Sequence, residues 1–210
     1  MKEISTAFTS PAQTWNARFG TDAYVFGTEP NDWLRRYAAQ WAAGAHVLCV
    51  ADGEGRNSVW LAKQGHNVDA FDISEVGVMK AESLASQSKV TVNFNVASCE
   101  DFAWKEGHYD GVAAIFVQFA EPVLRTRLFQ NMVSCLKPGG ILILQGYTPK
   151  QLDYGTGGPK VLSHLYTPEM LREAFRALDI QVLQEYEAEL KEGDGHNGPS
   201  ALIGLVGKKR

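Results

Sequence analysis

One short segment, VLCVADGEGRN at residues 47–57, constrains the fold of this chain more than any other. It begins with an apolar run typical of a buried strand, breaks at a glycine-rich turn, and continues directly into a helical pattern. Gly53 and Gly55 can adopt backbone angles that a Cβ disfavours, which lets main-chain N–H groups approach a bound ligand closely. The segment therefore predicts a ligand-binding turn between a strand and a helix.

One acidic residue after the turn, Asp72, supports this prediction. The strand-like run at residues 67–71 ends at Asp72, about twenty residues later, where a nucleotide-binding βαβ unit places the acid that binds ribose. Either signal alone is weak, because short glycine motifs and acids before helices are common. Together they predict a nucleotide cofactor site.

Strand-like and helix-like segments alternate along the rest of the chain. We expect strands at residues 46–51, 67–71, 90–96, 111–117, 141–144, 180–189 and 201–206. We expect helices at about 32–43, from the glycine turn to 64, at 74–86, at 122–136 and from 167 onward, with a turn at 137–140.

Continuous apolar strands separated by helices predict a parallel sheet that is covered on both faces. Only about ten residues join the last two strands, too few for a crossover helix, so these strands must pair antiparallel. The predicted fold class is α/β: a doubly wound, mostly parallel, seven-stranded sheet with a reversed strand in the C-terminal hairpin.

Composition excludes several classes of function. The length of 210 residues fits one domain, and the formal net charge of −4 gives no long-range attraction to nucleic acid. The N-terminus lacks the apolar core of a signal peptide and no stretch is long enough to cross a bilayer, which predicts a cytoplasmic protein. Cys49, Cys99 and Cys135 lack metal-ligand or disulfide spacing, so no metal is expected.

Four loops follow the carboxyl ends of strands and should converge on one site, because open α/β sheets bind ligands at this edge. They are residues 52–57, 72–73, 97–102 and 116–121. Asp72 is placed to accept hydrogen bonds from both ribose hydroxyls, and Ile73 and Phe102 to flank a flat base. Candidates for contacting the edge of that base are Ser98, Cys99 and Glu100.

The chain resembles the class I S-adenosylmethionine-dependent methyltransferases from residue 47 to 206. The resemblance is carried by the VLCVADGEGRN turn, Asp72, the CEDFAW, YDGVAAIF and LKPGG segments, and the closing hairpin. It implies a Rossmann-like methyltransferase fold that binds S-adenosyl-L-methionine, with the methionine part beside the glycine turn and adenine against the third loop. The expected cofactor-binding residues are Ala51, Asp52, Gly53, Gly55, Arg56, Asn57, Asp72, Ile73, Ser98, Cys99, Glu100, Phe116 and Trp15.

The sequence departs from that family in three places. Cys49 and Ala51 stand where the family usually has an acid and the first glycine, and Ser98 stands where an acid often meets the adenine amino group. These departures change the expected contacts with the cofactor and leave the expected fold unchanged.

Residues 15–30, WNARFGTDAYVFGTEP, are similar to the entry segment of tellurite-resistance methyltransferase-like and thiopurine-methyltransferase-like proteins. In those small enzymes the segment folds over cofactor and substrate, and its aromatic rings suit a positively charged sulfonium. We therefore expect an N-terminal lid segment, 1–30, ahead of a single methyltransferase domain, 31–210.

Methyl transfer from a sulfonium is an in-line displacement that needs alignment and a desolvated nucleophile, and no metal. The resemblance predicts a small-molecule acceptor: a thiol, a chalcogen oxyanion or a hydroxyl. His196 is the candidate catalytic base, because imidazole titrates near neutral pH. The candidate substrate-binding residues are Tyr24, Gln118, Phe119, Tyr154 and Gly157.

Two other functions stay open. A nicotinamide-dependent oxidoreductase uses a similar turn, although GEGRNS is one glycine short of GxGxxG. A non-catalytic cofactor-binding module accounts for the three departures from the family pattern. The segment IFVQ at 115–118 lacks the Asn/Asp-Pro-Pro-aromatic signature of nucleic-acid methyltransferases. We expect no nucleic-acid or membrane partner, and a monomer or weak homodimer.

Overall fold

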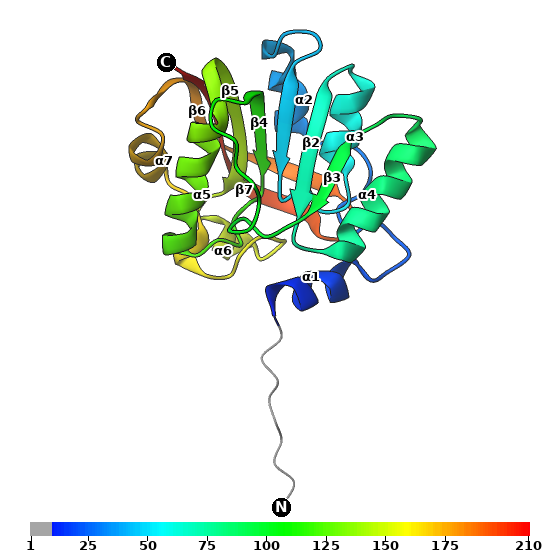
Figure 1. The fold of residues 1–210 in the computed structure, drawn as a ribbon. Helices are drawn as coiled ribbons and strands as arrows, with labels where there is room; N and C mark the ends of the chain where they lie inside the picture. The colour runs from blue at the N-terminus through cyan, green and yellow to red at the C-terminus, as the bar shows by residue number, and fades with distance from the viewer. Residues whose placement is uncertain (1–9) are drawn as a thin grey trace, which may run out of the picture.

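The computed structural model describes residues 10–210, which form a seven-stranded sheet between two layers of helices (Figure 1). The strands are β1 His46–Val50, β2 Asn67–Asp72, β3 Asn93–Val96, β4 Tyr109–Ile115, β5 Leu136–Tyr147, β6 Leu178–Glu192 and β7 His196–Lys209. The α-helices are α1 Pro11–Phe19, α2 Asp32–Tyr37, α3 Arg56–Lys63, α4 Glu75–Ser88, α5 Pro122–Cys135, α6 Gln151–Tyr154 and α7 Pro168–Ala174. Short 3-10 helices cover Ala38–Gln40 and Leu162–His164.

The strand order is β3-β2-β1-β4-β5-β7-β6. Strands β1 to β5 pair in parallel, whereas β7 runs antiparallel to both of its neighbours, β5 and β6. The order reverses at β1, which lies between β2 and β4, and such a reversal is where open α/β sheets bind ligands. The predicted fold class, a doubly wound sheet with one reversed strand, is confirmed.

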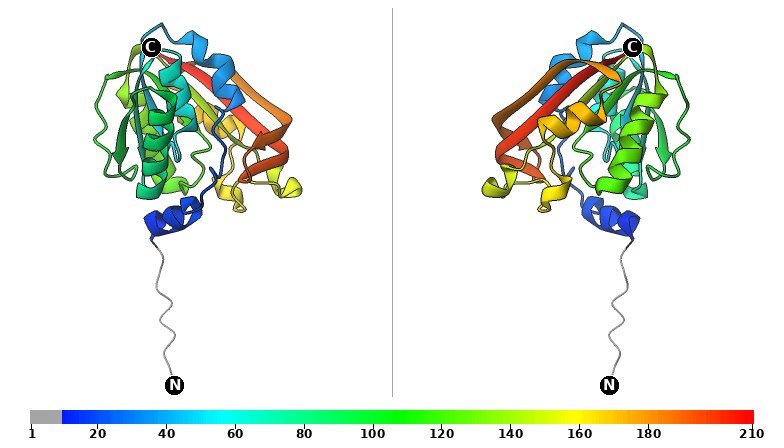
Figure 2. Two further views of the ribbon diagram at one scale, coloured as in Figure 1. Left: turned by 90° about the vertical axis from the view of Figure 1, so that its right-hand side faces the viewer. Right: turned by 90° about the vertical axis from the view of Figure 1, so that its left-hand side faces the viewer.

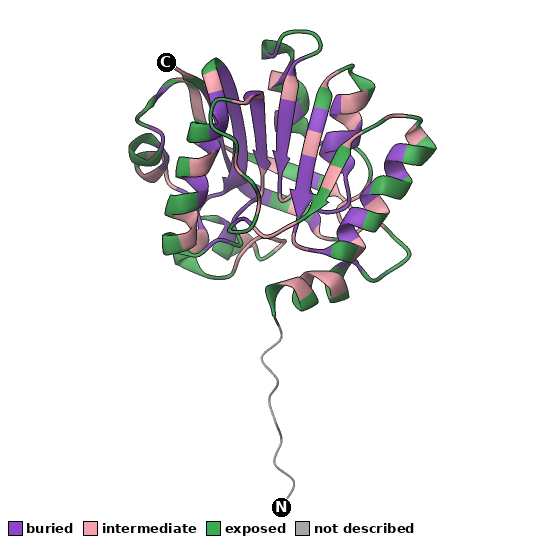
Figure 3. Ribbon diagram, viewed as in Figure 1, coloured by how far each residue is buried: buried purple, intermediate pink, exposed green. Residues whose placement is uncertain are grey.

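Helices cover both faces of the sheet (Figure 2), and each face carries its own hydrophobic core. On one face, Leu128 of α5 and Phe175 at the end of α7 are buried against the sheet. On the other face, Trp33 of α2 and Leu61 of α3 are buried in the same way. Because helices cover both faces, the central strands are buried almost throughout, which explains their continuous apolar runs (Figure 3).

Element boundaries differ from the sequence expectations mainly towards the sheet edges. Edge strand β3 begins at Asn93 rather than residue 90, and most of it is exposed, so burial imposes little pattern on its sequence. Strand β5 begins at Leu136, so the LKPGG segment, predicted as a turn, belongs to the strand. The final hairpin is longer than predicted, and its turn is residues 193–195.

Two helical segments also differ from expectation. The helix predicted for 32–43 ends as an α-helix at Tyr37 and continues as the 3-10 helix Ala38–Gln40. Helix α1 was not predicted, although Ser10 and Gln13 form a capping box ahead of it, with mutual hydrogen bonds of 2.9 and 3.2 Å. Residues 1–9 of the expected lid segment lie outside the described residues. Across the described part of the chain, no helix has both the length and the apolar character needed to span a membrane.

Candidate active site

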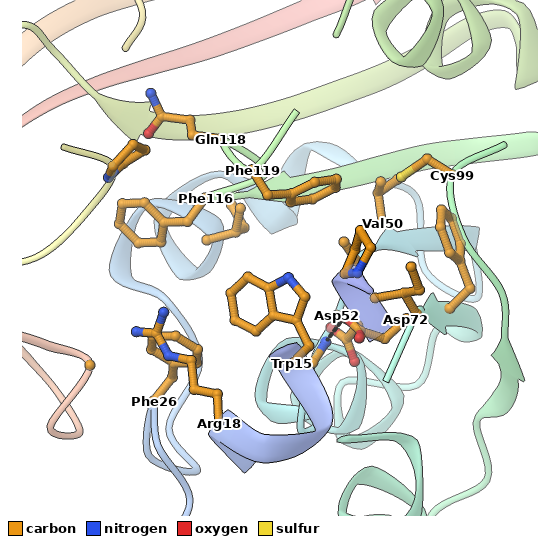
Figure 4. A pocket seen from close by; sticks show the side chains of 18 of the residues that line it. Trp15, Arg18, Phe26, Val50, Asp52, Asp72, Cys99, Phe116, Gln118 and Phe119 are labelled. Atoms are coloured by element: carbon orange, nitrogen blue, oxygen red, sulfur yellow. Dashed lines mark hydrogen bonds between the residues drawn. The ribbon is translucent and has the colours of Figure 1, made fainter. Parts of the chain in front are cut away.

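A cavity of about 880 Å³ opens at the carboxyl ends of the parallel strands (Figure 4). All four predicted loops line it, together with α1 and the turn of the final hairpin. The predicted cofactor residues in its wall are Ala51, Asp52, Gly53, Arg56, Asn57, Asp72, Ile73, Ser98, Cys99, Glu100, Phe116 and Trp15. The predicted substrate and catalytic residues in its wall are Gln118, Phe119, Gly157 and His196.

The glycine turn and Asp72 are joined by hydrogen bonds. The Gly53 N–H donates to Asp72 Oδ2 at 2.9 Å, and the Ser74 N–H donates to Oδ1 at 2.8 Å. Burial raises the pKa of the Asp72 carboxyl, and these backbone hydrogen bonds act in the opposite direction. Each carboxylate oxygen keeps a second acceptor position, so Asp72 can still bind two hydroxyl groups of a ligand.

Gly55 was predicted to contact the cofactor, but the structure places it behind the cavity wall. It precedes α3 with φ +88°, and a Cβ on it would lie 2.7 Å from the Ala81 Cβ of α4. Its absent side chain therefore permits close packing of α3 against α4, which supports the turn from behind.

Asp52 lies in the wall beside Gly53 and accepts a hydrogen bond from the Ser58 hydroxyl. Burial and the nearby Asp72 charge together raise its pKa to about 7, against the opposing effects of the Ser58 hydrogen bond and the Arg56 charge. The cavity therefore contains a carboxyl that is ready to ionise when a positive charge binds beside it.

The third loop lines the cavity through Ser98, Cys99 and Glu100. The aromatic ring of this loop, Phe102, does not line the cavity. Phe102, expected to flank a base, stacks on Phe71 with ring centroids 4.1 Å apart and packs in the core. That expectation is wrong, because a core position was available to the ring. Burial raises the pKa of the Cys99 thiol to about 12, so the thiol stays protonated at neutral pH.

The fourth loop brings Phe116 and Gln118 into the cavity (Figure 4). Phe116 has φ +57° and stacks on Tyr147 at 4.7 Å between centroids. The Gln118 amide is used inside the protein: its Nε2 donates to the backbone carbonyls of Tyr147 and His164 at 2.9 and 3.0 Å. Gln118 therefore fixes the loops of the cavity, while Phe119, 37% exposed, lies nearer to solvent.

His196 is buried in the cavity wall and is paired with a carboxylate that sequence reasoning missed. Its Nδ1 lies 3.3 Å from Glu192 Oε2, and Arg56 donates to the same oxygen at 2.8 Å. Burial would raise the pKa of Glu192, but its contacts with His196 and Arg56 lower it to about 2. Burial lowers the pKa of His196, partly offset by Glu192, so the imidazole is neutral at pH 7. An ionised Glu192 accepts from Nδ1–H, which leaves Nε2 as a proton acceptor.

The aromatic rings around His196 complete this part of the wall. Phe116 and Phe26 lie 4.3 and 4.5 Å from the imidazole between ring centroids. Within the described part of the chain, the Tyr147 hydroxyl and Arg56 Nη1 are both buried without a hydrogen-bond partner. Two unpaired polar groups beside a neutral histidine are available to a ligand.

Helix α1, part of the predicted lid segment, contributes to the cavity wall. Trp15 projects into the cavity, and Arg18 lies over the Trp15 and Phe26 rings at 5.2 and 5.0 Å (Figure 4). The Asn16 Oδ1 accepts from the Ser74 hydroxyl at 2.6 Å, which ties the helix to the loop that holds Asp72. Whether this segment opens and closes stays a prediction.

Two predicted substrate residues lie outside the cavity wall. The Tyr24 hydroxyl donates to the Lys80 carbonyl at 3.1 Å, and the ring packs beside α3 and α4. The Tyr154 hydroxyl donates to Glu187, and Lys150 lies over its ring. In both cases a long-range partner turns the aromatic side chain away from the site.

A doubly wound sheet with an antiparallel final strand is typical of the class I, Rossmann-like methyltransferase fold. The cavity lies where the strand order of this sheet reverses. Residues 47–140 match the family model of a methyltransferase domain. The predicted resemblance to S-adenosylmethionine-dependent methyltransferases is therefore confirmed over this part of the chain.

Comparisons with individual proteins agree with this family. The ubiquinone biosynthesis O-methyltransferase of Xanthomonas axonopodis pv. citri (strain 306) is 32% identical over 126 residues, which are 59% of this chain and 52% of that protein. The chain thus spans about half the length of the curated relatives it matches.

Solved structures share the fold over a larger part of the chain. A structure from work on the conversion of a disulfide bond into a thioacetal group during echinomycin biosynthesis superposes with a TM-score of 0.77 at 15% identity, covering 94% of this chain and 91% of that one. TehB from Haemophilus influenzae superposes with a TM-score of 0.68 at 15% identity, covering 95% and 67%. At these identities the likeness concerns the fold.

Proposed function

We propose that this protein transfers a methyl group from S-adenosyl-L-methionine to a small-molecule acceptor that carries a thiol, a chalcogen oxyanion or a hydroxyl. One observation carries the proposal: the neutral, carboxylate-paired His196 lines the same cavity as the bonded pair of Gly53 and Asp72. A site for a ribose and a site for a proton acceptor thus face one cavity.

The groups in the cavity wall fit this cofactor. Asp72 offers acceptors for the ribose hydroxyls, and the Gly53 backbone stands close to it without a side chain. Asp52 offers a negative charge to a cationic ligand. Arg56 Nη1 is a buried donor that has no partner among residues 10–210 and suits a carboxylate. When bound, the cofactor supplies an electrophilic methyl group on a positively charged sulfur.

The residues of this chain then have separable roles. Aromatic rings of Trp15, Phe26 and Phe116 exclude water, which favours displacement at a sulfonium. His196 Nε2 takes the proton from an acceptor hydroxyl, while Glu192 holds the ring and stabilises the imidazolium that forms. Phe119, at the outer part of the cavity, is placed to contact the acceptor.

The need for a catalytic base depends on the chemical class of the methyl acceptor. A hydroxyl must lose its proton during the reaction, a thiol is already partly ionised, and an oxyanion has no proton to lose. The ubiquinone O-methyltransferases are relatives whose name specifies oxygen as acceptor, which favours a hydroxyl. The buried base favours it as well, since an oxyanion needs none.

The test is to incubate the purified chain with S-adenosylmethionine labelled in its methyl group and a phenol, a thiol or tellurite. We expect transfer to the phenol, and a loss of at least about 100-fold in that rate in His196→Gln. His66→Gln is the matched control, because His66 lies outside the cavity. An equal rate in His196→Gln and His66→Gln contradicts the base assignment.

The same protein preparation separates the other two functions. Calorimetry with S-adenosylhomocysteine and with NAD distinguishes the cofactors: binding of NAD alone supports a nicotinamide-dependent oxidoreductase. Tight binding of S-adenosylhomocysteine with no transfer to any acceptor supports a non-catalytic module. A cytoplasmic location, a lack of nucleic-acid partners and a monomeric or weakly dimeric state stay predictions from the sequence.

A further inference from the structure

A second group of potential ligands lies at the opposite edge of the sheet from the cavity. His46 begins β1, Asp69 lies in the neighbouring β2, and His108 directly precedes β4, the other neighbour of β1. These are the amino ends of the strands, away from α1 and the cavity (Figure 1). One side-chain nitrogen or oxygen from each residue lies within 4.8 Å of the other two.

We propose that His46, Asp69 and His108 bind a first-row divalent transition-metal ion, for which Zn²⁺ is the probe. Two imidazoles and a carboxylate are ligands that Zn²⁺ accepts, whereas Ca²⁺ and Mg²⁺ prefer sites built from oxygen alone. His46 Nε2 lies 3.2 Å from Asp69 Oδ2. Ligands of a tetrahedral Zn²⁺ at about 2.05 Å lie about 3.3 Å apart, so this pair already has the required separation.

The Asp69 carboxylate is held in place by further hydrogen bonds. The buried Tyr109 hydroxyl donates to Oδ2 at 2.9 Å, and Asn93 Nδ2 donates to Oδ1 at 3.1 Å. Metal ligands in proteins commonly have such outer partners, which fix their orientation.

The two imidazoles are also arranged for binding. The rings of His46 and His108 meet edge to face, 4.9 Å apart between centroids. The Asp110 carboxylate accepts from the His46 backbone N–H at 2.9 Å, which fixes the start of β1. The His46 and Asp69 side chains are 28% and 14% exposed, so an ion can enter, and solvent completes its coordination.

The test is a titration of the untagged, chelator-treated full chain with Zn²⁺ against a chromophoric competitor. We expect one equivalent of Zn²⁺ to bind, and the affinity to fall at least about tenfold in His108→Gln. This variant removes one ligand and breaks no hydrogen bond recorded for the side chain, so the fold should be retained. His66→Gln is the control, since His66 precedes β2 at the same edge and lies outside the cluster.

A second measurement uses the parent chain alone, in case a variant does not fold. With ¹⁵N-labelled histidine, one equivalent of Zn²⁺ should shift the ring signals of two of the five histidines. Saturation with S-adenosylhomocysteine should leave Zn²⁺ binding unchanged, because the cavity is at the other edge. Absence of binding, unchanged affinity in His108→Gln, or an equal loss in His66→Gln overturns the proposal. None of these results depends on methyl transfer.

Discussion

The Asp72 carboxylate and the Gly53 backbone N–H are directly bonded, at 2.9 Å. The acid at the end of β2 therefore also positions the glycine turn after β1, and the two halves of the expected cofactor site form one unit. The Ser74 N–H, bonded to the other carboxylate oxygen, extends this unit to the start of α4. Loss of the carboxylate should thus affect both ligand binding and the local backbone.

Asp72→Ala should raise the Kd for S-adenosylhomocysteine at least about 100-fold. Two charge-assisted hydrogen bonds to the ribose are lost, each worth about 1.5 kcal/mol or more, and tenfold in Kd corresponds to about 1.4 kcal/mol. Isothermal titration calorimetry measures the change. Asp153→Ala, which removes an exposed carboxylate of α6, is the control and should bind like the parent. Unchanged affinity in Asp72→Ala removes this residue from the cofactor site.

Gly55→Ala should destabilise the protein much more than Gly65→Ala. Both glycines have almost the same φ, +88° and +87°, so the left-handed conformation disfavours alanine by a similar free energy, about 1–2 kcal/mol, at each position. At Gly65 nothing lies within 4 Å of the new Cβ, whereas at Gly55 the Ala81 Cβ is 2.7 Å away. Overpacking should add about 1–3 kcal/mol at Gly55. Urea unfolding measures both variants, and equal losses contradict a packing role for Gly55.

Local spacing in the sequence predicts the centre of the site well. Gly53 follows β1 and Asp72 ends the adjacent parallel strand β2, so the alternation of strands and helices suffices to bring them together. The same reasoning places Ser98 and Phe116 at the cavity, because they follow strands β3 and β4.

Long-range side-chain contacts explain what the sequence does not predict. Glu192 is 136 positions from Arg56 and occurs in a polar strand that offers no motif, so its pairing with His196 is visible only in the structure. Tyr24 and Phe102 are aromatic residues in loops of the site, and each has a better partner elsewhere: the Lys80 carbonyl and the Phe71 ring. Side-chain direction in loops depends on such partners more than on sequence position.

Cofactor binding should strengthen as the pH rises from 6 to 8. Asp52 has a pKa raised to about 7, so it is mostly protonated at pH 6 and mostly ionised at pH 8. A cationic ligand beside it favours the ionised form, and if only that form binds, Kd falls roughly tenfold across this range. Calorimetry with S-adenosylhomocysteine in buffers of different ionisation enthalpy should also detect proton release near pH 7.

Asp52→Asn is the matched control for this pH dependence, because it keeps the shape and removes the titration. The raised pKa of Asp52 also affects folding stability, which should fall as the pH rises, whereas cofactor affinity should increase. A carboxyl that holds its proton more tightly when folded contributes stability at low pH, and this contribution declines as pH rises from about 4 to 7. A pH-independent Kd in the parent, or the same slope in Asp52→Asn, contradicts the role of Asp52.

Asn16→Ala should loosen the lid segment over the cavity. The Asn16 Oδ1 accepts from the Ser74 hydroxyl at 2.6 Å and from the Val76 N–H at 3.3 Å, and Ser74 also caps α4 and contacts Asp72. Loss of both hydrogen bonds, about 1–2 kcal/mol together, should speed proteolytic cleavage within residues 10–30 about tenfold. Limited proteolysis with mass spectrometry measures the rate.

The same assay tests whether this segment closes on the cofactor. S-adenosylhomocysteine should slow cleavage in the parent, because Trp15 and Asp72 line one cavity and a ligand there contacts both sides. The protection should be weaker in Asn16→Ala and unchanged in Asp22→Ala, which alters an exposed residue of the same segment. Equal cleavage rates in Asn16→Ala and the parent contradict the role of the Asn16 hydrogen bonds, and cleavage of the parent at the same rate with and without ligand contradicts closure of this segment on the cofactor.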